Sequence, residues 1–414
     1  MTKNPFSSET FKDVWRKHFN TSKNEITFSF VKPISFYKHQ LVPCFVNLGN
    51  KLTNGLTYRI DNANLDYKNK VFLIRDIPSY QELQEPAKTS HLKLKKVFQY
   101  EGYITRVSNY ESIDVYLNTI YKSNTRSKLR RNIKRLESNF KVEYSMHHGA
   151  ISRADFDFVF ENFYKLFEKR YANKGEPCGE LNPVIWAFYT ELAFKMINEG
   201  TASLFVIYTD GKPIGITFSY HFDAILVEAL TVFDIDFYKY NIGHTTILKM
   251  LEWSFKNEIA IFDYTQGDFD YKKRWSDDRY QTYYHILYDS KSLKCRLTAG
   301  LLEKYFRFKR ECRERNYSSK VHSFNHWLLD GNTNKAVLIN THKVEIVSDK
   351  KLLDNYSQLI DIDLYKYTSQ RKALYDYLYL NPEPARNFKV CLYKNDSLLA
   401  IGENSILKIV KDES

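Results

Sequence analysis

Apolar and polar residues alternate in three neighbouring runs near the middle of the chain, over 202–208, 213–222 and 225–233. Asp210-Gly211 separates the first two runs, and such a dipeptide is a strong hairpin-turn signal. Period-two alternation joined by tight turns predicts an antiparallel β-meander. A shorter, mostly apolar run over 259–263 predicts a further strand, which we expect beside the third strand of the meander.

Apolar residues at helical spacing surround these strands. This spacing predicts amphipathic helices, which we expect over 1–20, 109–122, 125–138, 155–170, 183–198, 245–256 and 293–315. Between residues 25 and 107, short apolar runs separated by Asn, Asp and Gly predict strands instead. The pattern therefore predicts an α/β (α+β) fold with mixed, largely antiparallel sheets flanked by helices.

The expected helix over 125–138 is strongly basic. Six of the ten residues from Arg126 to Arg135 are Lys or Arg. Leu129, Ile133 and Leu136 recur at helical spacing, so one stripe faces a core and the cations surround it. Two interpretations stay open: a solvated helix face, or a phosphate-binding helix that uses Arg126, Lys128, Arg130 and Arg131.

The richest candidate site follows the strand over 259–263. The chain there changes from apolar residues to carboxylates, a glycine, cations and aromatics, namely Asp263, Gly267, Asp268, Tyr271, Lys272, Arg274 and Trp275. A strand that delivers such residues at its C-terminal end is typical of a ligand site. An ordinary charged loop is the alternative.

Composition narrows the class of partner and the compartment. A net charge of +12 favours polyanions such as nucleic acid, phosphorylated cofactors, nucleotide-linked sugars or an acidic membrane face. The five cysteines form no CxxC motif, which favours a reducing cytoplasm. We find no signal peptide and no apolar run long enough to span a bilayer. A length of 414 residues suggests two or three domains.

The order of elements, together with the phrase fDxxxGdxxYKxrW at 262–275, resembles the GNAT acyltransferase superfamily. Within it, the chain is most similar to acetyltransferases of cellulose and exopolysaccharide biosynthesis, a branch related to the Fem peptidyltransferases. The resemblance implies tandem GNAT-like halves. We therefore expect a divergent GNAT-like half over 1–120, a GNAT-like acyltransferase domain over 121–290, and a basic helical and small α+β appendage over 291–414.

The resemblance also implies where the acyl donor binds. Family members that use acetyl-CoA carry Gln/Arg-x-x-Gly-x-Gly/Ala before the long helix. The residues aligned here are Tyr240, Asn241, Ile242, Gly243, His244 and Thr245, so only the central glycine is kept. Backbone N–H groups and the helix dipole could still hold a diphosphate. The implied donor is an acyl-CoA, with acetyl-CoA as one candidate; the Fem relatives use aminoacyl-tRNA.

Acyl transfer needs a proton acceptor and a group that stabilises the oxyanion. Asp268 and Asp263 are the candidate carboxylates. Lys272 lies four residues after Asp268, so one helical turn would pair them. The lysine would then act as an electrostatic stabiliser or as a clamp on an acceptor phosphate. Arg274 and Gly267 complete the expected substrate site. Tyr271 and Trp275 would stack on a sugar or base, or pack in the core.

Three functions remain open at this stage. The first is a cytoplasmic N- or O-acyltransferase that acts on a nucleotide-sugar or on an envelope or exopolysaccharide precursor. The second is a Fem-like transferase that uses aminoacyl-tRNA, and the third is a non-catalytic module that binds RNA or an anionic membrane. We expect no metal, since His322 and His326 lack the glutamate of a zinc-protease motif. The sequence does not indicate an oligomeric state.

Overall fold

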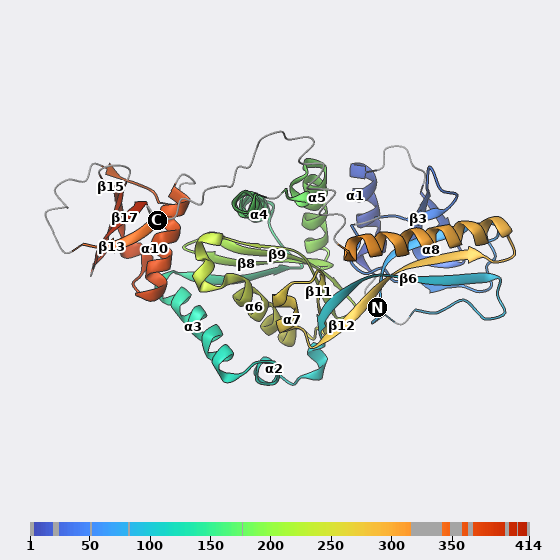
Figure 1. Cartoon of the computed structure of the whole chain (residues 1–414), viewed down its shortest axis with the longest axis horizontal. Coiled ribbons are helices and arrows are strands. Elements are labelled where there is room, and N and C mark those ends of the chain that lie inside the picture. Colours follow the sequence, from blue (N-terminus) through green and yellow to red (C-terminus); the bar gives the residue numbers. More distant parts are fainter. Residues whose placement is uncertain are drawn as a thin grey trace.

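The computed structural model describes residues 4–19, 25–49, 52–81, 83–175, 177–315, 342–347, 358–362, 367–393, 397–403 and 405–411. Within them the strands form a large sheet of twelve strands and a small sheet of five. Figure 1 shows an elongated molecule with the small sheet at one end. His322 and His326 lie outside the described residues.

The large sheet runs through both halves of the molecule. Its strands are β1 (Ile26–Phe28), β2 (Val31–Lys38), β3 (Phe45–Asn47), β4 (Arg59–Ile60), β5 (Val71–Pro78), β6 (Leu92–Thr105), β7 (Val142–His148), β8 (Ala202–Thr209), β9 (Lys212–Phe222), β10 (Ile225–Phe233), β11 (Ile261–Gln266) and β12 (Asp278–Asp289). They are ordered β1-β2-β3-β5-β12-β6-β11-β10-β9-β8-β7, and β4 pairs with β2.

Helices cover this sheet, and a small second sheet follows them. The helices are α1 (Glu9–Phe19), α2 (Ile113–Ile120), α3 (Ser123–Asn139), α4 (Arg153–Lys174), α5 (Pro183–Asn198), α6 (Ile242–Lys256), α7 (Asp270–Trp275), α8 (Leu293–Glu314) and α10 (Thr368–Leu380). A 3₁₀ segment, η4 (Ile235–Tyr240), precedes α6. The small sheet holds β13 (His342–Ile346), β14 (Gln358–Leu359), β15 (Lys389–Leu392), β16 (Leu398–Ile401) and β17 (Ile406–Lys411).

The predicted meander is confirmed. Strands β8, β9 and β10 pair antiparallel in sequence, and β11 lies in parallel beside β10. Helices α4 and α5 pack on one face of the meander and α6 on the other (Figure 1). Alternate residues of β8 therefore enter two different cores: Leu204 and Val206 one, Phe205 and Ile207 the other. The expected class, an α/β fold with a mixed, largely antiparallel sheet flanked by helices, is confirmed.

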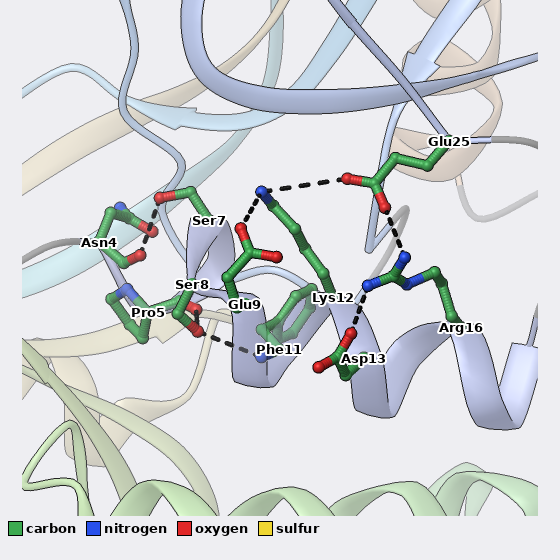
Figure 2. A network of polar contacts seen from close by, with 10 residues as sticks. All are labelled: Asn4, Pro5, Ser7, Ser8, Glu9, Phe11, Lys12, Asp13, Arg16 and Glu25. Carbon is green, nitrogen blue, oxygen red and sulfur yellow. Dashed lines mark hydrogen bonds and ion pairs between the residues drawn. The ribbon is translucent and has the colours of Figure 1, made fainter.

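The predicted first helix is also confirmed, as α1, and polar contacts hold it in place (Figure 2). The Lys12 ammonium is buried and lies 2.9 Å from Glu9 and 4.0 Å from Glu25. Arg16 also pairs with Glu25, at 3.2 Å, immediately before β1. A buried cation requires such partners. Because α1 also packs against α5, it connects the two halves of the large sheet.

The C-terminal part of the chain contacts the half of the molecule that contains the meander. The contact is made by α10, which packs against η4 and α3. Lys169 of α4 pairs with Asp234 and lies 2.7 Å from Asp236. Arg371 of α10 lies 2.6 Å from Asp236. Buried charges of opposite sign thus join α4, η4 and α10. Removing one of these partners would leave a buried charge without compensation.

Strand pairing bears on the expected division into 1–120, 121–290 and 291–414. Strand β12 lies between β5 and β6, and α8 packs on β12 and β6. Residues 278–314 therefore share a sheet and a core with strands of the N-terminal half. The three-domain division stays a proposal, and these contacts favour moving 278–314 into its first part. Among the described helices, none is both long and apolar enough to cross a membrane.

Candidate active site

Strands β10 and β11 lie together only where they begin. They pair over Ile225–Val227 and Ile261–Asp263. Beyond these residues the β10 register is irregular between Glu228 and Leu230, while β11 pairs with β6 on its other side. The sheet therefore splits after Val227 and Asp263. The carboxyl ends of parallel strands are a common place for ligands.

Asp263 occupies the edge of this split and is fully buried. Its carboxylate accepts hydrogen bonds from the Tyr80 hydroxyl at 2.8 Å, the Tyr280 hydroxyl at 3.0 Å and the Thr265 backbone N–H at 2.7 Å. Burial raises the pKa of Asp263 to about 6, although these donors and the Lys272 charge oppose the rise. The carboxylate is therefore ionised but held rigidly at neutral pH.

A strained turn follows Asp263. Thr265 has φ +61° and Gly267 has φ +117°. A β-branched residue at positive φ is an outlier, and such strain gathers at functional sites. A Cβ at Gly267 would lie 2.8 Å from the Phe269 ring, so only glycine fits.

The turn encloses the Lys272 ammonium, which is buried. The ammonium donates to the Gln266 carbonyl oxygen and lies 3.4 Å from the Thr265 hydroxyl. Burial lowers the pKa of Lys272, and the charges of Glu228 and Asp263 oppose that effect. The buried cation thus lies close enough to two buried carboxylates for their charges to act on its pKa.

Glu228, on β10, is the second of these carboxylates. Burial raises its pKa to about 7, the Lys272 charge lowers it, and the Asp263 charge raises it further. Its Oε2 atom is buried and has no hydrogen-bond partner among the described residues. A buried, unpartnered carboxylate oxygen with a pKa near neutrality is typical of a general acid or base.

The expected Asp268–Lys272 pair is wrong. Helix α7 begins at Asp270, after Gly267 has turned the backbone, so Asp268 is not one helical turn from Lys272. Asp268 is exposed and pairs with Lys273 instead, and the Tyr103 hydroxyl donates to it at 3.2 Å. These hydrogen bonds hold the pKa of Asp268 below its usual value.

Asp268 lines an open cleft of about 590 Å³ on the other side of the turn. Gln266, Gly267 and Lys273 line it from the turn, and Arg279 and Arg313 add two cations. Glu101 and Glu314 also line it, so the cleft presents three cations and three carboxylates. It can bind a polar, hydroxyl-rich molecule.

The loop before α6 lies beside the split but presents little side-chain surface. Tyr240, Ile242 and Thr245 are buried, and the Tyr240 hydroxyl accepts from the Asn139 amide at 2.7 Å. Asn241 has φ +58°, and its side chain does not cap the helix. The His244 and Thr245 backbone N–H groups donate to the Asn241 carbonyl oxygen, so those of Ile242 and Gly243 are the ones left for an anion at this helix end.

Cations gather at this helix end. His244 accepts a hydrogen bond from the Trp275 indole at 2.7 Å. Burial and the positive charges of Arg274 and Lys128 lower the pKa of His244 to about 4. The ring is therefore neutral at physiological pH. Gly243 packs closely here, since a Cβ would lie 3.2 Å from the Phe233 ring.

The expected basic helix is confirmed as α3, and its cations differ in exposure. Lys128, Arg130 and Arg131 are exposed, and Arg130 lies 3.7 Å from Asp114. Arg126 is half-buried and donates to the Tyr121 carbonyl oxygen. Arg126 thus has a structural partner, whereas Lys128 lies close enough to His244 to affect its pKa.

The two aromatics of the motif pack inside the protein. Trp275 is fully buried, stacks near Tyr116 and meets the Tyr121 ring edge-on. Its expected stacking on a sugar or base is therefore wrong. Tyr271 is half-buried and stacks on Phe269 with ring centroids 5.9 Å apart.

Sequence reasoning missed Glu228, Tyr80 and Tyr280. Glu228 is the one charged residue in the apolar run Ile225–Phe233, a signal that could have identified it. Tyr280 reaches Asp263 because Gly102 lies opposite, where a Cβ would come within 2.2 Å of the tyrosine ring. No local pattern indicates that contact.

Comparisons with known proteins agree with part of this site. Residues 123–273 match the family model described as an acetyltransferase (GNAT) domain. No curated protein matches the chain. Among solved structures, FemX is 13% identical over 73% of this chain and 95% of its own, with a TM-score of 0.48. A lysylphosphatidylglycerol synthetase domain described as putative, from Agrobacterium fabrum, is 9% identical over 72% of this chain and 97% of its own, at 0.42.

A tandem GNAT protein from the clavulanic acid biosynthesis pathway is 5% identical over 61% of this chain and 77% of its own, with a TM-score of 0.32. These scores are low, and the assignment rests on the family model. That model spans α3 to α7, and so includes the split, the α6 loop and the strained turn. Residues 123–273 thus resemble a GNAT acetyltransferase domain, and the protein is an acyltransferase.

Proposed function

We propose that the protein transfers an acyl group from a CoA thioester to an amine or hydroxyl, with the reaction at the β10–β11 split. The observation that carries the proposal is Glu228. It is a buried carboxylate beside the split, with a pKa of about 7 and an Oε2 atom that has no hydrogen-bond partner in the described part of the chain. About half of this carboxylate is ionised at neutral pH, which suits a general base.

Each buried group has a role in this scheme. Glu228 takes the proton of the acceptor amine or hydroxyl as that group attacks the acyl carbon. The Lys272 ammonium stabilises the negative charge that develops on the carbonyl oxygen. Asp263 holds the strained turn through Thr265 and keeps Lys272 charged. The bond from the acyl carbon to sulfur breaks, and the thiolate takes up a proton.

The donor's phosphates would bind at the N-terminus of α6. Its uncapped first turn, the helix dipole, and the nearby Lys128 and Arg274 support this placement. The side chains of Tyr240, Ile242 and Thr245 are buried, so backbone groups of 240–245 would make the contacts. We propose acyl-CoA as the donor for this reason, with acetyl-CoA as one member.

The acceptor would enter the cleft that Asp268 lines. Lys273, Arg279 and Arg313 supply cations for a phosphorylated acceptor, and Asp268 accepts hydrogen bonds from hydroxyl groups. A nucleotide-sugar or an envelope or exopolysaccharide precursor combines both features. The alternative, a Fem-like transferase that uses aminoacyl-tRNA, is favoured by the exposed cations Lys128, Arg130 and Arg131 on α3.

Calorimetric titration of the full chain with acetyl-CoA and longer CoA thioesters tests the donor. We expect binding that weakens with salt and that falls roughly tenfold or more in Lys128→Glu and Arg274→Glu. Lys141→Glu, an exposed cation just beyond α3, is the matched control and should bind as the parent does. Binding of a charged tRNA without any CoA binding would favour the Fem-like alternative. Equal CoA affinity in all variants would contradict the proposed phosphate site.

A further inference from the structure

Helix α8 carries two apolar faces, and among the described residues only one of them is covered. Cys295, Ala299, Leu302 and Phe306 are buried against the large sheet. A second stripe consists of large exposed side chains at intervals of four or three residues: Leu293 (61%), Leu297 (61%), Leu301 (68%), Tyr305 (56%) and Phe308 (65%). A stripe of this length exceeds the scattered exposed residues of an ordinary surface. It marks an interaction surface.

A neighbouring loop extends this stripe. Leu41, between β2 and β3, is 90% exposed. The loop is held in shape, because the His39 ring accepts hydrogen bonds from the backbone N–H groups of Leu41 and Val42 at 3.2 and 3.1 Å. Leu41 and Leu301 line one hollow of about 690 Å³. The stripe and the loop thus form one apolar surface, which we call the α8 face.

Cations surround and interrupt the α8 face. Helix α8 contains seven Lys or Arg residues and three Glu residues. Exposed Arg296, Lys304 and Arg307 alternate with the apolar side chains, and exposed Lys38 is the last residue of β2, before the Leu41 loop. Apolar side chains bordered by Lys and Arg are the signature of a helix that lies in a membrane interface. A second copy of the chain is a poorer occupant, because a twofold contact would bring this excess of positive charge against itself.

We propose that the α8 face docks on an anionic phospholipid surface. The apolar side chains enter the boundary between headgroups and acyl chains, and the cations contact the lipid phosphates. Arg313 and Glu314, at the end of the same helix, line the cleft that holds Asp268. The acceptor cleft would therefore open next to the membrane. The docking itself does not depend on the proposed function.

Flotation of the full chain with lipid vesicles tests the proposal. We expect the protein to float with vesicles of phosphatidylcholine and phosphatidylglycerol, and roughly tenfold less with phosphatidylcholine alone or at high salt. The double variant Leu301→Asp/Phe308→Asp should reduce flotation roughly tenfold or more. Phe158→Asp, which changes an exposed phenyl group on α4, is the matched control and should float like the parent.

A second variant separates charge from folding. Arg296→Glu/Lys304→Glu changes only exposed side chains, so its melting temperature should equal that of the parent. We expect it to lose the preference for phosphatidylglycerol. The proposal is overturned if the parent does not float, or if both double variants float as it does. It is also overturned if the parent is a dimer that Leu301→Asp/Phe308→Asp converts to monomers, which would make this face an interface between copies.

Discussion

Two carboxylate–lysine groups lie on either side of one short turn, and they behave in opposite ways. On the inner side, Glu228 and Asp263 share the buried Lys272, and burial raises the pKa of both acids. On the outer side, Asp268 meets Lys273 in the open cleft, and hydrogen bonding lowers the pKa of Asp268. The same residue types therefore give a buried carboxylate with a raised pKa and an exposed carboxylate with a lowered one.

Solvent access causes this difference. Desolvation disfavours a charged carboxylate, whereas a cation in contact with it favours the charge. In the inner group, desolvation has the larger effect on the carboxylate pKa values. In the outer group, contact between Asp268 and the Lys273 ammonium has the larger effect. The inner group thus suits proton transfer, and the outer group suits binding of a polar acceptor.

The largest effect should follow substitution of the inner base. Glu228→Gln keeps the size of the side chain and removes the proton-accepting oxygen. We expect turnover to fall roughly 100-fold or more, as is typical when general base catalysis is lost. In the parent, activity should rise with pH through about 7, the pKa of Glu228. Turnover measured against pH checks both, and a variant within about threefold of the parent would contradict the role of Glu228.

The next effect concerns the inner cation. Lys272→Met removes the charge that lowers the pKa of Glu228. We expect the rise of activity with pH (the pH–activity limb) to move to higher pH. Turnover at neutral pH should fall by an order of magnitude or more. Lys273→Met is the matched control, because this neighbouring lysine pairs with Asp268, and its limb should not move. Identical pH limbs in Lys272→Met and the parent would show that the two groups are not coupled.

The inner group should also influence stability. A buried carboxyl whose folded pKa is raised contributes most below its unfolded pKa, and the contribution is lost as pH rises through the folded value. For Glu228 this window runs from 4.5 to about 7. Glu228→Gln should therefore match the parent below about pH 4 and exceed its unfolding free energy by about 3 kcal/mol above pH 7. Urea unfolding at several pH values measures this, and a difference that stays constant with pH would contradict it.

The sequence predicts the secondary structure around the two groups well, but it predicts the contacts within the buried group poorly. The meander, the basic helix and the motif at 262–275 follow from local patterns, and the structure contains the first two as expected. The buried group depends on contacts between distant segments: Tyr80 lies 183 residues from Asp263. The predicted Asp268–Lys272 pairing was wrong because it assumed a continuous helix through both residues. The backbone turns at Gly267, and helix α7 begins only at Asp270. Burial, which separates the two groups, is a property of the fold and not of spacing.

The smallest effect should come from the outer group. Asp268→Asn removes a charge from an exposed side chain that lines the acceptor cleft. Because this carboxylate would bind the acceptor and not take its proton, we expect KM for the acceptor to rise roughly tenfold while kcat changes little. The pH–activity limb and the melting temperature should match those of the parent, since Asp268 is solvated. Steady-state kinetics with the acceptor varied at saturating donor separates KM from kcat. A large loss of kcat with unchanged KM would instead place Asp268 at the reacting atoms and reverse the assignment of the two groups.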